Sequence, residues 1–203
     1  MNVPFRALLI AALIAMSAGP AAAEWKAASR FQQRLAAIAI DQTREHVVYD
    51  GSYRVIAYPG GDVPRDRGVC ADVIIRAYRE LGIDLQVLIH EDMAAHFAVY
   101  PHDWGLAHPD PNIDHRRVPN LQTFFARNGP ALPVSRNPLD YRPGDLVTWF
   151  VAGSLPHIGI VSVELNPDGT RPLMVHNIGA GPQLEDMLFD YPVTGHYRYP
   201  AAD

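Results

Sequence analysis

The chain has 203 residues, of which 48% are hydrophobic and 19% charged, a size that suits one domain with a sizeable core. Its 22 acidic and 17 basic residues give a formal charge of −5. Nucleic acid is therefore a poor candidate partner, because phosphate binding requires a clustered positive surface and the one dense basic stretch, residues 115–117, is short.

The first 23 residues have the pattern of a secretory signal peptide. Arg6 precedes an apolar run from Ala7 to Met16, and small residues end at Ala23, after which cleavage is expected. That run is shorter than the roughly 20 apolar residues of a membrane span, and no later segment approaches this length. We therefore expect a periplasmic or secreted protein without a membrane span, in which residues 24–203 form a single domain.

The first half of the mature chain is predicted to be mainly helical, because its apolar residues recur at helical spacing outside one alternating stretch. The predicted elements are a helix over 24–45, a strand over 53–58, a helix over 69–81 and a helix over 85–98. Cys70 lies in the first turn of the third element, which Gly82 ends. Asp84 can cap the fourth element.

The second half is predicted to begin with a loop and to end as a sheet. Residues 100–119 contain four prolines, three histidines and three aspartates without a period, which indicates an ordered loop or lid. The further predicted elements are a short helix over 121–127 and strands over 146–151, 157–163, 173–177 and near 195–199. Helices followed by an antiparallel sheet indicate the α+β class.

Cys70 is the only cysteine of the chain and therefore cannot form an internal disulfide. At the start of a helix, the positive end of the helix dipole would lower the pKa of its thiol and favour the nucleophilic thiolate. Unpaired backbone N–H groups there could also stabilise an oxyanion. The alternative is that Cys70 is a small buried apolar residue, the common role of a lone cysteine.

His157 is the best candidate of nine histidines for the base that activates Cys70, because it stands at the mouth of a predicted strand. Gly159 lies two residues further on the same face. Its missing side chain is expected to let the helix that carries Cys70 pack there. A solvated strand histidine is the alternative.

His176, at the end of the next predicted strand, is expected to orient the imidazole of His157. A hairpin symmetric about residues 166 and 167 pairs position 157 with 176, whereas a turn centred on residues 168 and 169 shifts the pairing by about two rungs. Asn177 is the second candidate for this role, although strand alternation turns it to the opposite face.

Histidines and aspartates of the 100–119 loop are candidate metal ligands, but their spacing matches no common zinc motif, and we expect no metal or other cofactor. Arg116 and Arg117 either bind a substrate carboxylate with forked hydrogen bonds or are surface charges. Asp72 and Arg76, one turn apart, are expected to be a helix-start carboxylate and its ion pair.

Four sequence stretches carry a resemblance to the NlpC/p60 family. Residues 68–82 (GVCADVIIRAYRELG) look like its cysteine-bearing helix, residues 142–149 (RPGDLVTW) and 156–161 (PHIGIV) resemble two of its strands, and residues 174–177 (MVHN) resemble the strand with the third polar residue. A closer resemblance, over nearly the whole mature chain, is to domain of unknown function 1287. It rests on residues 112–120 (NIDHRRVPN), 176–183 (HNIGAGPQ), 185–186 (ED) and 194–199 (TGHYRY).

The resemblance implies a papain-like fold, N-terminal helices packed on a C-terminal antiparallel sheet, and a triad of Cys70, His157 and His176. It implies a hydrolase that cleaves amide bonds of peptidoglycan stem peptides through a thioester, with Tyr58 in the substrate groove. With Tyr58 we place Asp72, Arg116 and Asn177 as candidate substrate-binding residues. Two alternatives stay open, a wall-peptide binding module with the same fold and an acyltransferase with the same nucleophile; the oligomeric state is open too.

Overall fold

The computed structural model describes residues 28–201, so the predicted signal peptide and the first residues of the predicted 24–45 helix lie outside the described residues. The α-helices are α1 (Arg30–Gln42), α2 (Cys70–Glu80), α3 (Leu85–His96) and α4 (Val118–Asn128). Short 3-10 helices lie at Phe97–Val99, Asp114–Arg116 and Pro138–Asp140. No helix within residues 28–201 is long and apolar enough to cross a membrane.

Local capping signals explain where the first and third helices begin. In α1, the Ser29 side chain accepts a hydrogen bond from the backbone N–H of Gln32, and the Gln32 side chain accepts one from the backbone N–H of Ser29. In α3, Asp84 accepts from the backbone N–H of Gln86, so the cap predicted at Asp84 is confirmed.

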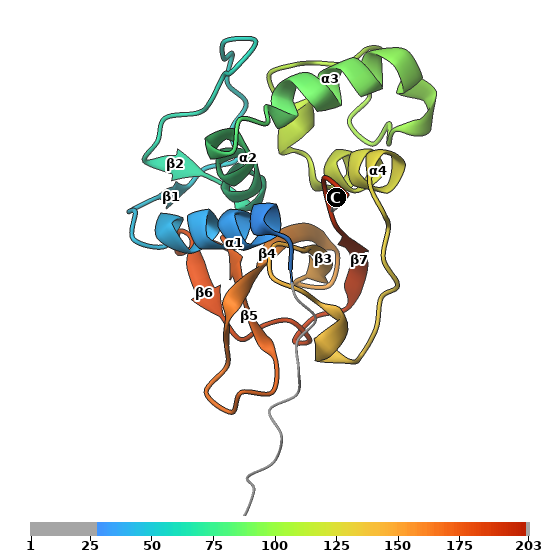
Figure 1. Cartoon of the computed structure of the whole chain (residues 1–203). Coiled ribbons are helices and arrows are strands. Elements are labelled where there is room, and N and C mark those ends of the chain that lie inside the picture. Colours follow the sequence, from blue (N-terminus) through green and yellow to red (C-terminus); the bar gives the residue numbers. More distant parts are fainter. Residues whose placement is uncertain (1–27, 202–203) are drawn as a thin grey trace, which may run out of the picture.

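Five strands form an antiparallel sheet in the second half of the chain, in the order β6-β5-β4-β3-β7 (Figure 1). The strands are β3 (Leu146–Val151), β4 (Leu155–Leu165), β5 (Pro172–His176), β6 (Gln183–Glu185) and β7 (Val193–Tyr197). The order of helices and sheet in the chain is that of an α+β protein, as predicted.

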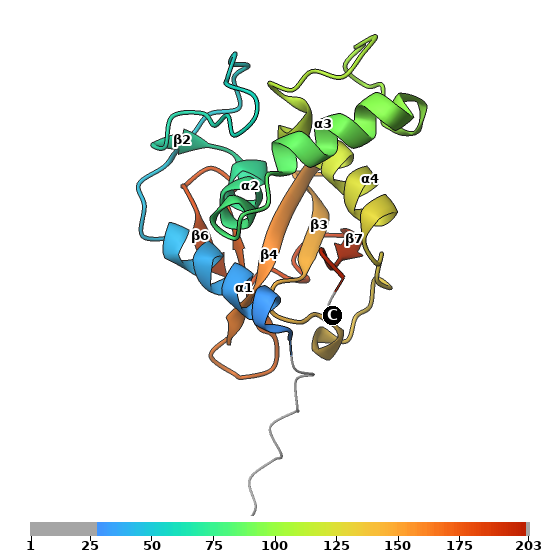
Figure 2. The same ribbon diagram turned by 45° about the horizontal axis from the view of Figure 1, so that its top comes forward.

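The sheet is buried on both faces. Figure 2 shows the helices on one face, where α1 and α2 lie across β4. That core contains Leu35 of α1, Ile74 of α2, and Ile158 and Ile160 of β4. On the opposite face, a second core is centred on Trp149 and is covered by connecting segments instead of helices. Because side chains alternate along a strand, neighbouring residues of β4 belong to different cores.

The structure differs from the predicted elements in one strand that does not form, in three short strands that were not predicted and in the start of one helix. Residues 53–58 form no strand: this segment is largely exposed, and its Ile56 N–H is satisfied by the side chain of Asn112 instead of a neighbouring strand. A parallel pair of two-residue strands, β1 (Val48–Tyr49) and β2 (Arg67–Gly68), flanks it instead. The helix predicted over 121–127 begins three residues earlier, with Pro119 in its first turn, where a missing N–H costs nothing. The strand β6 was not predicted.

Candidate active site

Cys70 is the first residue of α2 and is 4% exposed. The helix start is held by Asp72, whose carboxylate accepts the backbone N–H of Val69 at 2.6 Å. The backbone N–H groups of Cys70 and Ala71 favour the thiolate form of the sulfur. The thiol therefore lies at the amino end of a capped helix, as the sequence predicts.

The backbone N–H of Ile158, the residue directly after His157, favours the thiolate form of Cys70. Cys70 and Ile158 belong to the core on the helix-covered face, whereas the His157 ring lies on the Trp149 face, and the described contacts include no hydrogen bond between the sulfur and His157. Burial nevertheless raises the pKa of Cys70 to about 11, more than the amides of Ile158, Ala71 and Cys70 itself lower it. The expectation of a lowered thiol pKa is wrong, because the thiol itself is almost completely buried. A reaction at this thiol would therefore require a base that takes its proton.

Two histidines and a glutamate form a continuous hydrogen-bonded row on the Trp149 face of the sheet. Nε2 of His157 lies 3.1 Å from Nδ1 of His176, and Nε2 of His176 lies 2.9 Å from the Oε2 atom of Glu185. Both imidazoles are buried, at 2% and 1% exposure, and the Trp149 ring lies 6.0 Å from the His157 ring. Glu185, on β6, is half exposed.

The hydrogen bonds of this row determine which imidazole nitrogens carry protons. A carboxylate only accepts hydrogen bonds, so Nε2 of His176 carries the proton that it donates to Glu185, and its Nδ1 accepts. Nε2 of His157 must then donate to His176, which leaves Nδ1 of His157 as a lone pair. Burial first, and His176 second, lower the pKa of His157 to about 3, so its imidazole is neutral near pH 7. Burial likewise lowers the pKa of His176, although Glu185 opposes this.

The strand register explains why the two imidazoles meet. Ile160 pairs with Val175 and Val161 with Met174, so His176 lies opposite Gly159 rather than opposite His157. The pairing is shifted by two residues from the pairing of position 157 with 176, as was expected for a turn centred later than residues 166 and 167. A Cβ atom at Gly159 would lie 3.2 Å from the Cβ of His176 and 3.3 Å from the Trp149 ring. The missing side chain therefore makes room for His176, and not for the Cys70 helix as expected.

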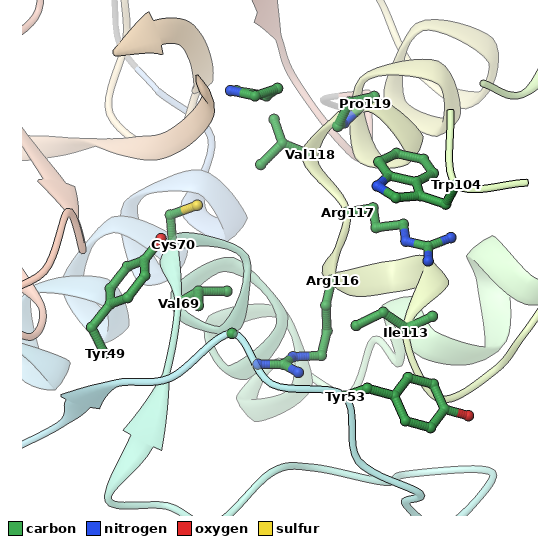
Figure 3. A pocket seen from close by; sticks show the side chains of 12 residues that line it. Tyr49, Tyr53, Val69, Cys70, Trp104, Ile113, Arg116, Arg117, Val118 and Pro119 are labelled. Atoms are coloured by element: carbon green, nitrogen blue, oxygen red, sulfur yellow. The ribbon is translucent and has the colours of Figure 1, made fainter. Parts of the chain in front are cut away.

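A cavity of about 430 Å³ opens beside Cys70 (Figure 3). Cys70 and Tyr49 lie on one side of it, and Trp104 and Arg117 lie on the other. The complete lining consists of Tyr49, Gly51, Tyr53, Val69, Cys70, Trp104, Ile113, Arg116, Arg117, Val118, Pro119 and Pro156. Its size falls within the range of small-molecule and peptide pockets.

Asp72 and Arg116 form a buried ion pair, with both side chains 2% exposed. Nε and Nη2 of Arg116 lie 2.8 and 2.9 Å from the two carboxylate oxygens of Asp72. The predicted pairing of Asp72 with Arg76 is wrong, since Arg76 binds Asp62. Asp72 does not line the cavity, and its carboxylate is used by Arg116 and by the helix start, so its assignment to substrate binding is corrected.

Two further predicted substrate-binding residues lie away from the cavity lining. Tyr58 packs edge-on against His90, and the tyrosines at the cavity are Tyr49 and Tyr53. Asn177 is fully buried, and its side chain donates to the carbonyl of Gly68 while accepting from a backbone N–H of the following turn. It joins the end of β5 to the segment before Cys70, so its role in the structure is to position that segment.

Sequence reasoning missed two residues of the site. Glu185 needs the pairing of β6 with β5 to be recognised, because Met174 pairs with Glu185 and places it on the His176 face. Tyr49 precedes the predicted strand that proved wrong. It lines the same cavity as Cys70, and burial, followed by the nearby Cys70 and Asp72, raises the pKa of its phenol.

The loop histidines do not gather into a metal site. Among residues 28–201, no group of three histidine, cysteine, aspartate or glutamate side chains is arranged to hold a metal ion. His115 is buried against Arg116, and burial lowers its pKa to about 4.

Comparison with known proteins adds the family to this geometry. The family model described as "Domain of unknown function (DUF1287)" matches residues 36–199. The chain belongs to this family. Its DUF1287 domain thus includes Cys70, both histidines of the row and Glu185. The chain is also similar to "Uncharacterized protein YijF" of Escherichia coli (strain K12), with 58% identity over 151 residues, which are 74% of this chain and 73% of that protein.

Proposed function

We propose that the protein is a cysteine hydrolase that cleaves amide bonds, with Cys70 as nucleophile and His157 as general base. The support for this proposal is the row of His157, His176 and Glu185, which leaves a lone pair on His157, together with a helix-start thiol packed near Ile158, the next residue of β4. A nucleophile, a base and an orienting group in this order are the parts that nucleophilic acyl transfer requires.

The first half of the reaction forms a thioester. Cys70 is a neutral thiol at neutral pH, so its proton passes to Nδ1 of His157 while the sulfur attacks the carbonyl carbon of the amide. The positive charge on His157 is shared with His176 and is balanced by the carboxylate of Glu185. When the tetrahedral intermediate collapses, the C–N bond breaks and His157 returns the proton to the leaving amine.

The second half of the reaction restores the thiol. His157 takes a proton from water as the water oxygen attacks the thioester carbon, the C–S bond breaks, and the proton returns to the sulfur as the carboxylic acid leaves. The backbone N–H of Cys70, at the unpaired amino end of α2, is the group we assign to the oxyanion in both halves.

The proposed substrate is a peptidoglycan stem peptide in the periplasm or outside the cell. The support is the sequence resemblance to NlpC/p60 proteins, with their papain-like arrangement of a helix-start cysteine and strand histidines, together with the predicted signal peptide over residues 1–23. A cavity of about 430 Å³ beside the sulfur has room for a few residues of such a peptide.

The test is digestion of purified muropeptides, with the products separated by mass. Wild type should release fragments, and Cys70→Ala, which removes only the sulfur, should release none above background. Absence of cleavage by wild type, or equal cleavage by both proteins, would contradict the proposal. If added amines are acylated in preference to water, the protein is an acyltransferase; if Cys70 labels slowly and nothing is cleaved, the binding-module alternative gains support.

A further inference from the structure

The two neighbouring arginines of the cavity wall are not equivalent. The guanidinium of Arg116 donates hydrogen bonds to Asp72 and to the backbone carbonyls of Asp50 and Ser52, at 2.8 to 3.4 Å. The guanidinium of Arg117 has a single described hydrogen bond, to Asp114, at 3.4 Å. An arginine has five N–H donors, so Arg117 keeps donors for another acceptor.

The positive charge of Arg117 is also balanced less completely by nearby carboxylates than that of Arg116. Burial lowers the pKa of Arg117 by more than Asp114 and Asp110 raise it. For Arg116 the same burial effect is outweighed by Asp72, and its pKa is raised. A partly buried cation whose pKa is depressed is stabilised when an anion binds beside it, because the anion replaces the water that burial removed.

Trp104 holds the Arg117 guanidinium in place. Its ring centroid lies 4.1 Å from the central guanidinium carbon, a cation–π contact that fixes the plane of the group and leaves the edge donors free. Figure 3 shows this pair on the side of the cavity opposite Cys70. The described lining contains two arginines and no aspartate or glutamate, so the cavity favours an anion.

We propose that Arg117 is a specificity-determining residue that binds a carboxylate of the substrate, held across the cavity from the reacting carbonyl. The substrate class is therefore an acidic peptide or acidic amide, a statement that rests on the proposed hydrolase function. The forked donors of an arginine suit the two oxygens of a carboxylate, and Arg116 cannot take this role because Asp72 already occupies it.

Labelling of Cys70 tests this proposal without turnover. The probes are 3-maleimidopropanoate and its neutral amide, which have nearly the same size; the sulfur bonds to one carbon of the double bond and the other carbon takes up the thiol's proton. Cys70 is the only cysteine, so the labelling rate, followed by intact-protein mass, reports one site. In wild type the acid should react at least about fivefold faster, relative to its intrinsic rate with a free thiol, than the amide.

Arg117→Gln should abolish this preference while the amide reacts at its wild-type rate, which shows that the cavity is intact. Arg34→Gln, at an exposed position of α1, is the matched control and should keep the preference. Raising the salt concentration should lower the rate of the acid alone. Equal relative rates for the two probes in wild type, or an unchanged ratio in a folded Arg117→Gln variant, would overturn the proposal. Neither result depends on muropeptide cleavage, so failure of the hydrolase proposal remains distinguishable.

Discussion

Two buried histidine–carboxylate clusters lie on this sheet, and they differ in what is left unpaired. In the first, Nε2 of His157 is hydrogen-bonded to His176, and the other nitrogen of His176 is hydrogen-bonded to Glu185. In the second, His196 on β7 faces Asp145 with Nε2 at 2.8 Å and the carbonyl of Pro133 with Nδ1 at 3.2 Å. Both rings are 2% exposed, so burial alone does not separate them.

In the second cluster both ring nitrogens of His196 have partners, although a cavity of about 240 Å³ lies beside the ring. Arg198 holds both oxygens of Asp145, at 2.6 and 2.7 Å, and the backbone N–H of Arg142 donates to the same carboxylate. Each nitrogen of His196 faces an oxygen acceptor, so neither is available to take a proton from a substrate. The Tyr141 ring stacks on His196 with centroids 4.3 Å apart. This cluster joins β3 to β7, and its role is structural.

Both clusters contain a carboxylate, but only one contains a histidine nitrogen with a free lone pair. A histidine needs this lone pair to act as a base, so the lone pair, and not the carboxylate, distinguishes the two. Glu185 and Asp145 are both hydrogen-bonded to a histidine Nε2. Only in the first cluster does a second histidine lie between the carboxylate and the outer imidazole, so that Nδ1 of His157 has no described hydrogen-bond partner. The clusters therefore respond differently to matched substitutions.

The largest expected difference is between His157→Gln and His196→Gln. Glutamine at 157 keeps a donor for His176 but cannot act as a base, so muropeptide cleavage should fall about 10³-fold or more, with little loss of stability. Glutamine at 196 should leave cleavage nearly unchanged and lower the free energy of unfolding by about 2 kcal/mol, because it loses buried hydrogen bonds. Cleavage rates and urea denaturation separate the two. Similar losses of activity in both variants would contradict the assignment.

A smaller effect is expected at the outer end of the row. Glu185→Gln removes the charge and allows the amide to donate to His176, which reverses the proton arrangement; cleavage should fall about 10- to 100-fold. Asp186→Asn is the matched control, since Asp186 binds Arg171 and Asn166 at the hairpin and touches neither histidine. If both variants keep wild-type kcat, Glu185 does not orient the row.

The parts of the fold with local signals were predicted from the sequence. The end of α2 at Gly82, the cap at Asp84 and the alternation of β3 to β5 are each decided by neighbouring residues, and the structure has them where expected. The class α+β followed from their order.

The errors concern partners far apart in the sequence. Asp72 pairs with Arg116, 44 residues away, instead of with the nearby Arg76, and the 53–58 segment is held by Asn112 instead of by a strand. The raised pKa of Cys70 has the same origin, because it depends on how completely several elements bury the thiol. Helix-start position is a local property, whereas desolvation is a property of the whole packed site.

The last expected effect is a pH dependence of stability, which arises from His157 in the row and from His115 outside it. Burial holds the pKa of His157 at about 3 and that of His115 at about 4, below the value of about 6.5 for an unfolded histidine. Between these values the unfolded chain binds protons that the folded chain does not, so stability is complete above about pH 6.5 and is lost as the pH falls.

The loss should be roughly 1.4 kcal/mol per pH unit for each such histidine, measured by urea denaturation between pH 6.5 and 4.5. His157→Gln and His115→Gln should flatten this slope equally, because each removes one buried neutral imidazole. Only His157→Gln should also stop muropeptide cleavage, since His115 has no bond to the row of His157, His176 and Glu185 among the described contacts. If neither variant changes the slope of stability against pH, these imidazoles take up protons in the folded protein as readily as in the unfolded chain. Burial would then not keep His157 neutral.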